Sequence, residues 1–351
     1  MNNNKLQEYG YDDFFKSQLK ELGIDEEEFS IARVLEVQKD RYKILTESEE
    51  KWAVLKASIF YDNSSEIYPA VGDFTIIKNN EFGDDVIYHV LNRKSKFSRL
   101  DSFHGKEQVV AANFDYVFIM TSLNYDFNVK RIERYLTAAW ESGGMPVLVL
   151  TKVDLYPDYS EQKSQLQEIA PGVDLIAISS HTGEGISELK KYISPKKTIV
   201  FLGSSGVGKS SLVNALLGED KMLVNSVRED DSKGRHTTTF RQLLKLEDGG
   251  MIMDTPGMRE LGMWDVSKGI SITFSDIEIF SEKCKFRNCK HESEPGCAVR
   301  AALESGELSE DRWKNYNKLK REAAFAEKKE MLNTRMKNKA LEKSMNKFHR
   351  K

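Results

Sequence analysis

One eight-residue segment constrains the fold of this 351-residue chain more than any other: Gly203-Ser204-Ser205-Gly206-Val207-Gly208-Lys209-Ser210. It matches the pattern G-x-x-x-x-G-K-[ST], follows the apolar run Thr198–Leu202 and precedes a helical pattern that starts at Ser211. Strand, glycine-rich loop and helix are the context of a Walker A loop, in which backbone N–H groups and the helix N-terminus bind phosphates. We therefore expect this loop to bind a nucleoside triphosphate, with Lys209 at the β- and γ-phosphates and the Ser210 hydroxyl on Mg²⁺.

A second phosphate element follows the next apolar strand pair. The predicted strand Met251–Asp254 ends in Asp254-Thr255-Pro256-Gly257. A carboxylate at a strand end can hold Mg²⁺ through water, and a glycine three residues on can offer its N–H to a γ-phosphate. We expect Asp254 and Gly257 to take these two roles.

A polar stretch between these elements, residues 228–239, has the character of a switch loop. It ends in Arg235-His236-Thr237-Thr238-Thr239, and we expect one threonine, preferably Thr238, to complete the Mg²⁺ shell. The alternative is a plain surface loop that leads into a strand. Met258 stands where Ras-like GTPases place the glutamine that orients water, so slow intrinsic hydrolysis is expected, with His236 as one candidate for the missing group.

Two strand ends earlier in the chain carry the elements that select the base. Thr151-Lys152-Val153-Asp154 follows an apolar strand, and Ser179-Ser180 follows the next one. They are similar to the [NT]-K-x-D and S-[AS] elements of GTPases. An aspartate that accepts bonds from guanine N1–H and the 2-amino group discriminates against adenine, which has neither donor. The sequence therefore predicts GTP, with Asp154 reading the base and the stem of Lys152 packing over it.

The order of these elements is unusual, because the base loops precede the phosphate loops. In an ordinary GTPase the base elements come last. The order here predicts a circularly permuted GTPase domain with a mostly parallel α/β sheet. Permutation places the C-terminal region directly after the switch elements, so the nucleotide state can reach whatever is attached there.

The segment before this domain reads as a small β-barrel. Five short alternating or β-branched runs lie between residues 31 and 92, without a helix among them. An OB-fold is the first choice and an SH3-like barrel the alternative. We predict four parts: an acidic extension (1–29), the barrel (30–105), the permuted GTPase domain (106–278) and a zinc-binding module with a basic helix (279–351).

All three cysteines lie within fourteen residues, at Cys284, Cys289 and Cys297, and His291 lies among them. Three thiolates and one imidazole complete a tetrahedral Cys₃His zinc site, and Pro295-Gly296 can turn the chain back. The close spacing favours a metal site in a reducing compartment over a disulfide framework. Because no coordination position is left open, we expect a structural zinc ion.

Charge is distributed unevenly along the chain. The net charge is −3, but the last 39 residues carry +9 and the first 312 carry −12. Apolar residues recur at helical spacing from Trp313 to Phe348, so a basic amphipathic helix is expected. RNA, an acidic membrane surface and a partner helix all suit such a helix. Packing on its own domain is an equal alternative up to Phe325, and rRNA contact is favoured for the more basic part that follows. Without a signal peptide or an eighteen-residue apolar run, a cytoplasmic protein without membrane contact is expected.

The whole pattern resembles the family of ribosome small-subunit-dependent GTPase A. The resemblance covers about residues 30 to 325 and includes 109–115 (VVAANFD) and 234–239 (GRHTTT). It implies a slow GTPase that is stimulated by the small ribosomal subunit, contacts its rRNA and acts late in its maturation, releasing GDP. Thr151 departs from the commoner asparagine of the base motif, which removes one amide partner.

We therefore expect a monomeric GTP hydrolase that binds the small ribosomal subunit and couples hydrolysis to release. Two alternatives remain open. One is a GTP-gated rRNA-binding adaptor in which hydrolysis is not essential, and the other is an ATPase of RNA metabolism, which the argument from Asp154 opposes.

Overall fold

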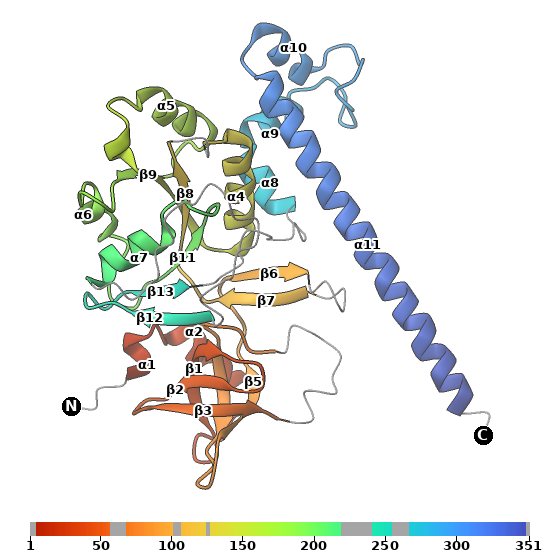
Figure 1. Cartoon of the computed structure of the whole chain (residues 1–351). Helices are drawn as coiled ribbons and strands as arrows, with labels where there is room; N and C mark the ends of the chain where they lie inside the picture. Colours follow the sequence, from red (N-terminus) through yellow and green to blue (C-terminus); the bar gives the residue numbers. More distant parts are fainter. Residues whose placement is uncertain are drawn as a thin grey trace, which may run out of the picture. The chain divides into compact units, whose positions relative to one another are not determined.

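The computed structural model describes residues 5–56, 68–100, 107–123, 127–218, 241–254 and 267–348 (Figure 1). These residues fall into two compact units. One is drawn from residues 1–135 and 142–262, and the other from 136–141 and 263–351.

The first unit contains every β-strand of the described chain. The strands are β1 (Ser30–Val37), β2 (Tyr42–Leu45), β3 (Glu50–Leu55), β4 (Phe74–Lys78), β5 (Asp85–Val90), β6 (Lys96–Leu100), β7 (Glu107–Ala112), β8 (Tyr116–Ser122), β9 (Met145–Thr151), β10 (Leu175–Ile178), β11 (Thr198–Leu202), β12 (Arg241–Lys245) and β13 (Met251–Asp254). Its helices are α1 (Lys5–Glu8), α2 (Asp13–Glu21), α5 (Ser160–Ile169), α6 (Ile186–Leu189), α7 (Lys209–Leu217), most of α4 (Val129–Ser142) and the 3₁₀ helix η2 (Val153–Leu155).

Strands β1 to β5 form a closed barrel. Their order is β1-β2-β3-β5-β4, and β4 pairs back onto β1. Only β3 and β5 run parallel, which is the Greek-key arrangement of an OB-fold rather than of an SH3-like barrel. Alternate side chains fill the interior, and Val34, Ile44 and Ile77 are fully buried there. The predicted OB-fold is confirmed.

The second part of this unit is a six-stranded sheet in the order β10-β9-β8-β11-β13-β12. The first five strands are parallel, and β12 is antiparallel to β13. Aromatic rings pack in its core, where the centroid of Phe118 lies 5.8 Å from Phe201 and 5.9 Å from Tyr192. This sheet is the α/β domain expected from the alternation of strands and helices.

The two β structures share backbone hydrogen bonds. Strand β12 pairs antiparallel with the end of β1, with Glu36 opposite Gln242 and Val37 opposite Arg241. The barrel strands therefore continue the α/β sheet, and Figure 1 shows β12 lying between β13 and β1.

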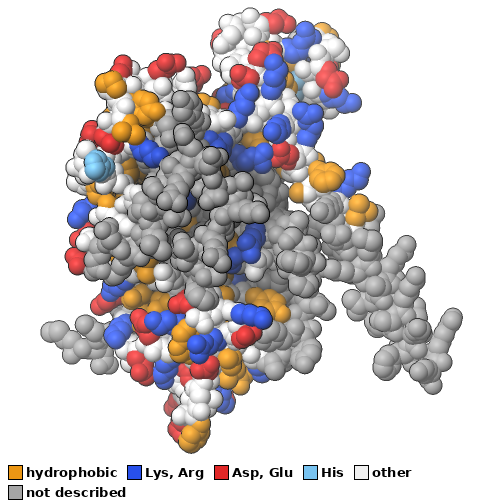
Figure 2. Space-filling model, viewed as in Figure 1, with side chains coloured by type: hydrophobic (Ala, Val, Ile, Leu, Met, Phe, Trp, Pro, Cys, Tyr) orange, Lys and Arg blue, Asp and Glu red, His pale blue; other side chains and the backbone are white. Residues whose placement is uncertain are grey.

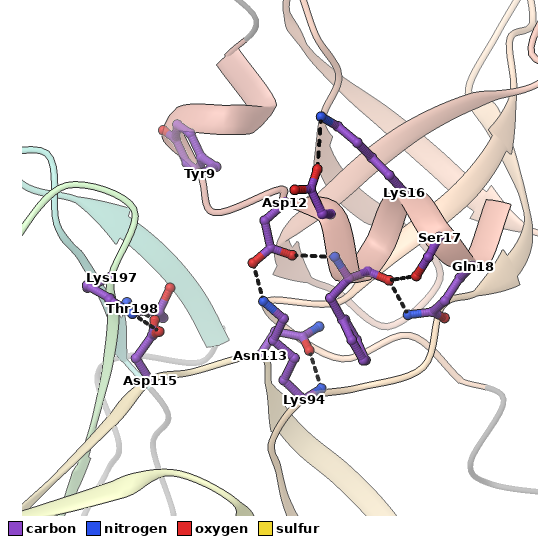
Figure 3. Close-up of polar contacts among 12 residues, drawn as sticks. Tyr9, Asp12, Lys16, Ser17, Gln18, Lys94, Asn113, Asp115, Lys197 and Thr198 are labelled. Carbon is purple, nitrogen blue, oxygen red and sulfur yellow. Dashed lines mark hydrogen bonds and ion pairs between the residues drawn. The ribbon is translucent and has the colours of Figure 1, made fainter. Parts of the chain in front are cut away.

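The acidic N-terminal segment, expected as an extension, is packed into this unit. Phe15 of α2 is 1 % exposed, and its ring lies 4.2 Å from that of Phe74. Asp12 caps α2 by accepting a bond from the N–H of Phe14 and pairs with Lys94 (Figure 3). Gln18 exchanges two hydrogen bonds with the backbone of Asn92. Helix α2 thus closes one side of the barrel.

Arg33 joins the N-terminal segment, the barrel and the α/β sheet. The residue is 1 % exposed and donates to backbone carbonyl oxygens of Tyr9, Gly72 (3.3 Å) and Asn113 (3.1 Å). It also donates to Thr198 Oγ1 (3.0 Å) and contacts Met251 Sδ at 3.3 Å. All these acceptors are uncharged, and burial lowers the pKa of Arg33 to about 10.

The five strands expected for the barrel end at residue 92, but the structure forms a further hairpin, β6–β7, after them. Lys96 and Arg99 indicate a segment exposed to solvent, whereas Phe97 between them is buried. The ring of Phe97 stacks on that of Phe114, and the two ring centroids are 4.8 Å apart. Lys96 opposes Ala112 and Leu100 opposes Glu107 in the pairing. This strand is stabilised by a partner distant in sequence, which the local pattern does not reveal.

The second unit is helical. It contains α8 (Ser267–Thr273), α9 (Ser275–Glu282), α10 (Ala298–Ser305) and α11 (Glu310–Phe348). Phe274, Ile277 and Leu319 are fully buried in its core. Arg312 binds both carboxylate oxygens of Asp276, at 2.8 and 2.7 Å, and so joins α11 to α9. Among the described residues, no helix is both long enough and apolar enough to cross a membrane.

Candidate nucleotide and metal sites

The Walker A segment lies in the predicted context, after the central strand β11 and before α7. Gly203 has φ +155°, and a Cβ atom there would lie 2.7 Å from the carbonyl oxygen of Met120. Gly208, the N-cap residue before α7, has φ +104°, a left-handed conformation that glycine adopts without strain. The Nζ atom of Lys209 donates to the carbonyl oxygens of Gly203 (2.5 Å) and Ser204 (2.6 Å). The ammonium group is thus held over the loop that is expected to bind phosphates.

The remaining loop residues differ in exposure. Ser205 and Gly206 are exposed, Ser210 and Ser211 are half-buried, and Val207 is 1 % exposed. Val207 therefore anchors the loop in the core while its neighbours stay accessible. Helix α7 directs its first N–H groups toward this loop, as expected of an anion-binding helix N-terminus.

The first base loop is bonded directly to the phosphate loop. Thr151 at the end of β9 is 3 % exposed, and its hydroxyl donates to the carbonyl oxygen of Val207 at 2.7 Å. Lys152 has φ +60°, and its Nζ atom donates to the carbonyl oxygen of Gly206 at 2.8 Å. Two consecutive residues therefore fix the distance between the two loops. Both residues were expected at the base, and their contacts with the phosphate loop were not expected.

The second base loop is stabilised by its own side chain. Ser179 is fully buried, and its hydroxyl accepts from the N–H groups of His181 (3.2 Å) and Thr182 (3.1 Å). Ser180 beside it is half-buried. Asp154, in η2, is exposed, as a residue that must reach a ligand should be. Val153 before it is buried and holds η2 against the core.

All these loops lie at one end of the sheet. Strands β8 to β11 and β13 are parallel, so their carboxyl ends meet there, and Asp254 is the last residue of β13. In open α/β sheets, ligands bind outside this end of the strands. Thr238, Gly257, His236 and Met258 lie outside the described residues.

The cysteine cluster is a second site, in the helical unit. The ligand atoms of Cys284, Cys289, His291 and Cys297 all lie within 4.8 Å of one another. Tetrahedral zinc with the usual bond lengths separates two sulfur atoms by about 3.8 Å and sulfur from nitrogen by about 3.5 Å. Cys284 Sγ lies 3.9 Å from Cys297 Sγ, and His291 Nδ1 lies 3.6 and 3.4 Å from these sulfur atoms. These three separations match a tetrahedral zinc site.

Neighbouring groups hold these ligands in place. Glu294 accepts from the N–H groups of Lys290 (2.8 Å), Glu292 (3.0 Å) and Ser293 (3.1 Å), which lowers its pKa to about 2. Gly296 has φ +74° and turns the chain back, as the sequence suggested.

Helices on either side also contact the ligands. The ring of Trp313 meets that of His291 edge to face at 5.7 Å, and Ser281 Oγ lies 3.5 Å from His291 Nε2. Burial opposes ionisation of Cys284, but hydrogen bonds with the backbone N–H groups of Val299 and Ala298 and with the other two cysteines together lower the pKa of its thiol, whereas burial raises the pKa of Cys289 to about 11. A lowered thiol pKa favours the thiolate that metals bind.

Known proteins share this architecture. The family model for the RsgA GTPase matches residues 90–264. The chain is 46 % identical over 324 residues to "Small ribosomal subunit biogenesis GTPase RsgA 2" of Listeria monocytogenes, covering 92 % of this chain and 91 % of the relative. It is 42 % identical over 296 residues to "Small ribosomal subunit biogenesis GTPase RsgA 2" of Lactiplantibacillus plantarum, with 84 % of each chain covered. The chain belongs to the RsgA GTPase family.

Solved structures agree with this RsgA assignment. YjeQ from Thermotoga maritima matches with a TM-score of 0.61 at 30 % identity, covering 83 % of this chain and 97 % of that one. YloQ, described as a circularly permuted GTPase, matches with a TM-score of 0.56 at 25 % identity, covering 83 % and 93 %. The predictions of a permuted GTPase fold, of GTP hydrolysis and of a GTPase of ribosome biogenesis are confirmed. Neither the adaptor nor the ATPase alternative is favoured.

Proposed function

We propose that this RsgA-family GTPase binds the small ribosomal subunit late in its maturation, hydrolyses GTP slowly until the subunit stimulates it, and uses hydrolysis to leave. The observation that carries this proposal is the bonding of the base loop to the phosphate loop through Thr151 and Lys152. Because both loops are fixed to one another, guanine recognition and phosphate binding are parts of one rigid site. We place the protein in the cytoplasm, as a monomer.

Each site residue takes a defined role in this proposal. Asp154 accepts from the guanine edge, Lys152 covers the ring, and Ser179 and Ser180 shape the opposite loop. The N–H groups of the loop from Gly203 to Ser211 surround the phosphates. Lys209 leaves its carbonyl partners and neutralises charge that develops on the γ-phosphate during attack by water.

Magnesium would be held by the hydroxyl groups of Ser210 and Thr238, with Asp254 behind a water ligand. When bound, the ion neutralises charge on the phosphate oxygens. Gly257 offers its N–H group to the γ-phosphate. No side chain with the chemistry of a water-positioning glutamine occupies position 258, so we propose that the small subunit completes the site.

Zinc is proposed as the resident ion of the Cys284, Cys289, His291 and Cys297 cluster, because the separations of the donor atoms suit its tetrahedron. All four positions come from protein side chains, so the ion would be structural. It would order the loop between α9 and α10, which has few buried side chains of its own.

We propose that the zinc-binding module and the basic part of α11 contact rRNA. Figure 2 shows Lys and Arg side chains, together with some acidic ones, on the surface of this unit. Lys285 and Arg287 are exposed, and the partly exposed ring of Phe286 lies 5.6 Å from Lys285 Nζ. Basic and aromatic groups together suit phosphates and unstacked bases.

The four parts predicted from the sequence, bounded at residues 29, 105 and 278, serve as our proposed domain limits.

The test is GTP turnover measured with and without purified small ribosomal subunits. We expect slow turnover alone and a large rise with subunits. Lys209→Ala should abolish both rates, and Asp154→Asn should weaken GTP binding about 100-fold without improving ATP binding. Lys163→Ala, at an exposed position of α5, is the matched control. Turnover that subunits do not raise, or ATP that displaces GTP, would overturn the proposal.

A further inference from the structure

The turn between β4 and β5, residues 79–84, presents an apolar side chain to solvent. Phe82 is 95 % exposed, the largest exposed fraction among the large hydrophobic residues that the structure describes, and Phe325 follows at 71 %. Turns of this kind are usually built from polar residues, and a fully exposed phenyl ring loses the stabilisation that burial gives. A ring in this position is suited to insertion into a pocket on another molecule.

The turn that carries this ring is fixed by its own hydrogen bonds. The N–H group of Phe82 donates to Asn80 Oδ1 at 3.2 Å, and the N–H group of Asn80 donates to Asp85 Oδ1 at 2.9 Å. Asn80 Nδ2 also donates to the carbonyl oxygen of Asp84 at 3.3 Å. The backbone under Phe82 is thus already ordered, which reduces the entropy that binding would cost.

The base of the hairpin is supported as well. Lys78 pairs with Glu28 at 2.5 Å, and its Nζ atom lies 5.9 Å from the ring centroid of Phe29. That ring meets Tyr88 edge to face at 5.2 Å. The turn therefore projects from a packed platform.

The charge of the turn decides what it can bind. Residues 79–85 contain Glu81, Asp84 and Asp85 but no lysine or arginine. The nearest base in sequence, Lys78, is already paired with Glu28. Surfaces that stack bases of RNA combine aromatic rings with Lys and Arg that neutralise phosphates, and this turn would instead repel the phosphates. Its chemistry is complementary to a basic protein surface.

We propose that the β4–β5 turn docks onto a Lys- and Arg-rich protein, with Phe82 in an apolar pocket and Glu81 and Asp84 on the basic rim. The inference rests on the proposed function and deepens it, because it makes a protein of the small subunit, not its rRNA, the partner of this turn. Buried aromatic anchors of this kind carry much of the affinity of an interface.

The test uses the full-length protein, purified small subunits and a non-hydrolysable GTP analogue. Phe82→p-benzoylphenylalanine places a photoreactive group at the tip of the turn. After irradiation, the adduct is digested with ribonuclease or with protease. An adduct to a basic protein, resistant to ribonuclease, supports the proposal. An adduct to RNA overturns it, and so does the absence of any adduct when the labelled protein cosediments with subunits.

Affinity gives an independent measure. Phe82→Ala should weaken cosedimentation at least about tenfold, and Glu81→Lys should weaken it by a similar factor. Glu247→Lys, in the exposed acidic turn between β12 and β13, should leave it unchanged. Intrinsic GTP turnover without subunits should be the same in all variants, which shows that they fold. If the wild-type protein itself fails to cosediment, the proposed function fails, whereas wild-type binding that Phe82→Ala leaves unchanged overturns only this inference.

Discussion

Replacing Arg33 by lysine would keep the buried positive charge but remove the planar fork of donors. The guanidinium group reaches four oxygen atoms and one sulfur atom on Tyr9, Gly72, Asn113, Thr198 and Met251. An ammonium group has three N–H donors, so at least two acceptors lose their bond. A hydrogen bond to a charged group contributes about 1.5–3 kcal/mol, so Arg33→Lys should lower the free energy of unfolding by about 3–6 kcal/mol.

Arg33→Met removes both the hydrogen-bond donors and the buried charge. Burial lowers the pKa of Arg33 from 12.5 to about 10, which corresponds to a cost of about 3 kcal/mol for keeping the charged form inside the protein. Methionine loses the hydrogen bonds but also removes this cost. Losing all five contacts at the same value costs about 8–15 kcal/mol, which exceeds the charge burial that is relieved, so we expect Arg33→Met to be more destabilising than Arg33→Lys.

Thermal unfolding by scanning calorimetry measures the effect. For a unit of this size, each kcal/mol moves the melting temperature by about 2–4 °C, so Arg33→Lys should lower it by about 6 °C or more. The control is Arg41→Lys, since Arg41 lies over the ring of Trp52 at 4.1 Å on the barrel surface, and a shift below about 1 kcal/mol is expected there. The expectation is refuted if Arg33→Lys melts with the wild type, or if Arg33→Met is clearly the more stable of the two variants.

Three further predictions concern the two sites. Thr151→Val should weaken GTP binding at least about tenfold by titration calorimetry, because the Val207 carbonyl loses its donor, while Thr151→Ser should retain wild-type affinity. Cys284→Ser should reduce bound zinc below one equivalent by metal analysis and lower the helical circular dichroism signal, and a full equivalent with an unchanged spectrum would contradict the assigned ligand set. The pKa of Glu294 is lowered from 4.5 to about 2, so its contribution to stability is complete above about pH 4.5 and is lost as the pH falls through about 2. NMR titration of the carboxyl group measures this pKa, and a value near 4.5 would exclude the arrangement.

Much of the fold was predictable because its signals are local. The five barrel strands alternate apolar and polar residues, and the loop from Gly203 to Ser210 has strict chemical requirements at fixed spacing. The hairpin β6–β7 was missed because Phe97 is buried by Phe114, a contact invisible in the basic segment around it. The pairing of β1 with β12 joins residues about 200 positions apart in the chain, and no local pattern encodes it.

The nucleotide and metal sites were likewise predictable only in those features that have a local sequence signal. Motif spacing predicted a cluster of three cysteines and His291, and the structure brings the donor atoms of these four residues within 4.8 Å of one another. It did not reveal that Thr151 and Lys152 bond to the phosphate loop, since these bonds depend on how neighbouring strands align. Nor did it reveal the role of Glu294, whose carboxylate accepts three backbone N–H groups within a single short loop.

The pairing of β1 with β12 also has a consequence for the aggregation of truncated forms of the protein. An unpaired outer strand is a template for other chains, and natural sheets protect such strands by covering or capping them. Here β1 pairs with Arg241 and Gln242 at the start of β12, which would otherwise be the last strand of the α/β sheet. A truncated protein without residues 1–92 would leave β12 open to self-association. Loss of activity after such a deletion would therefore reflect aggregation of the truncated protein before it reflected a lost contact with a partner. The barrel protects the edge of the GTPase sheet and so helps to keep the protein in solution.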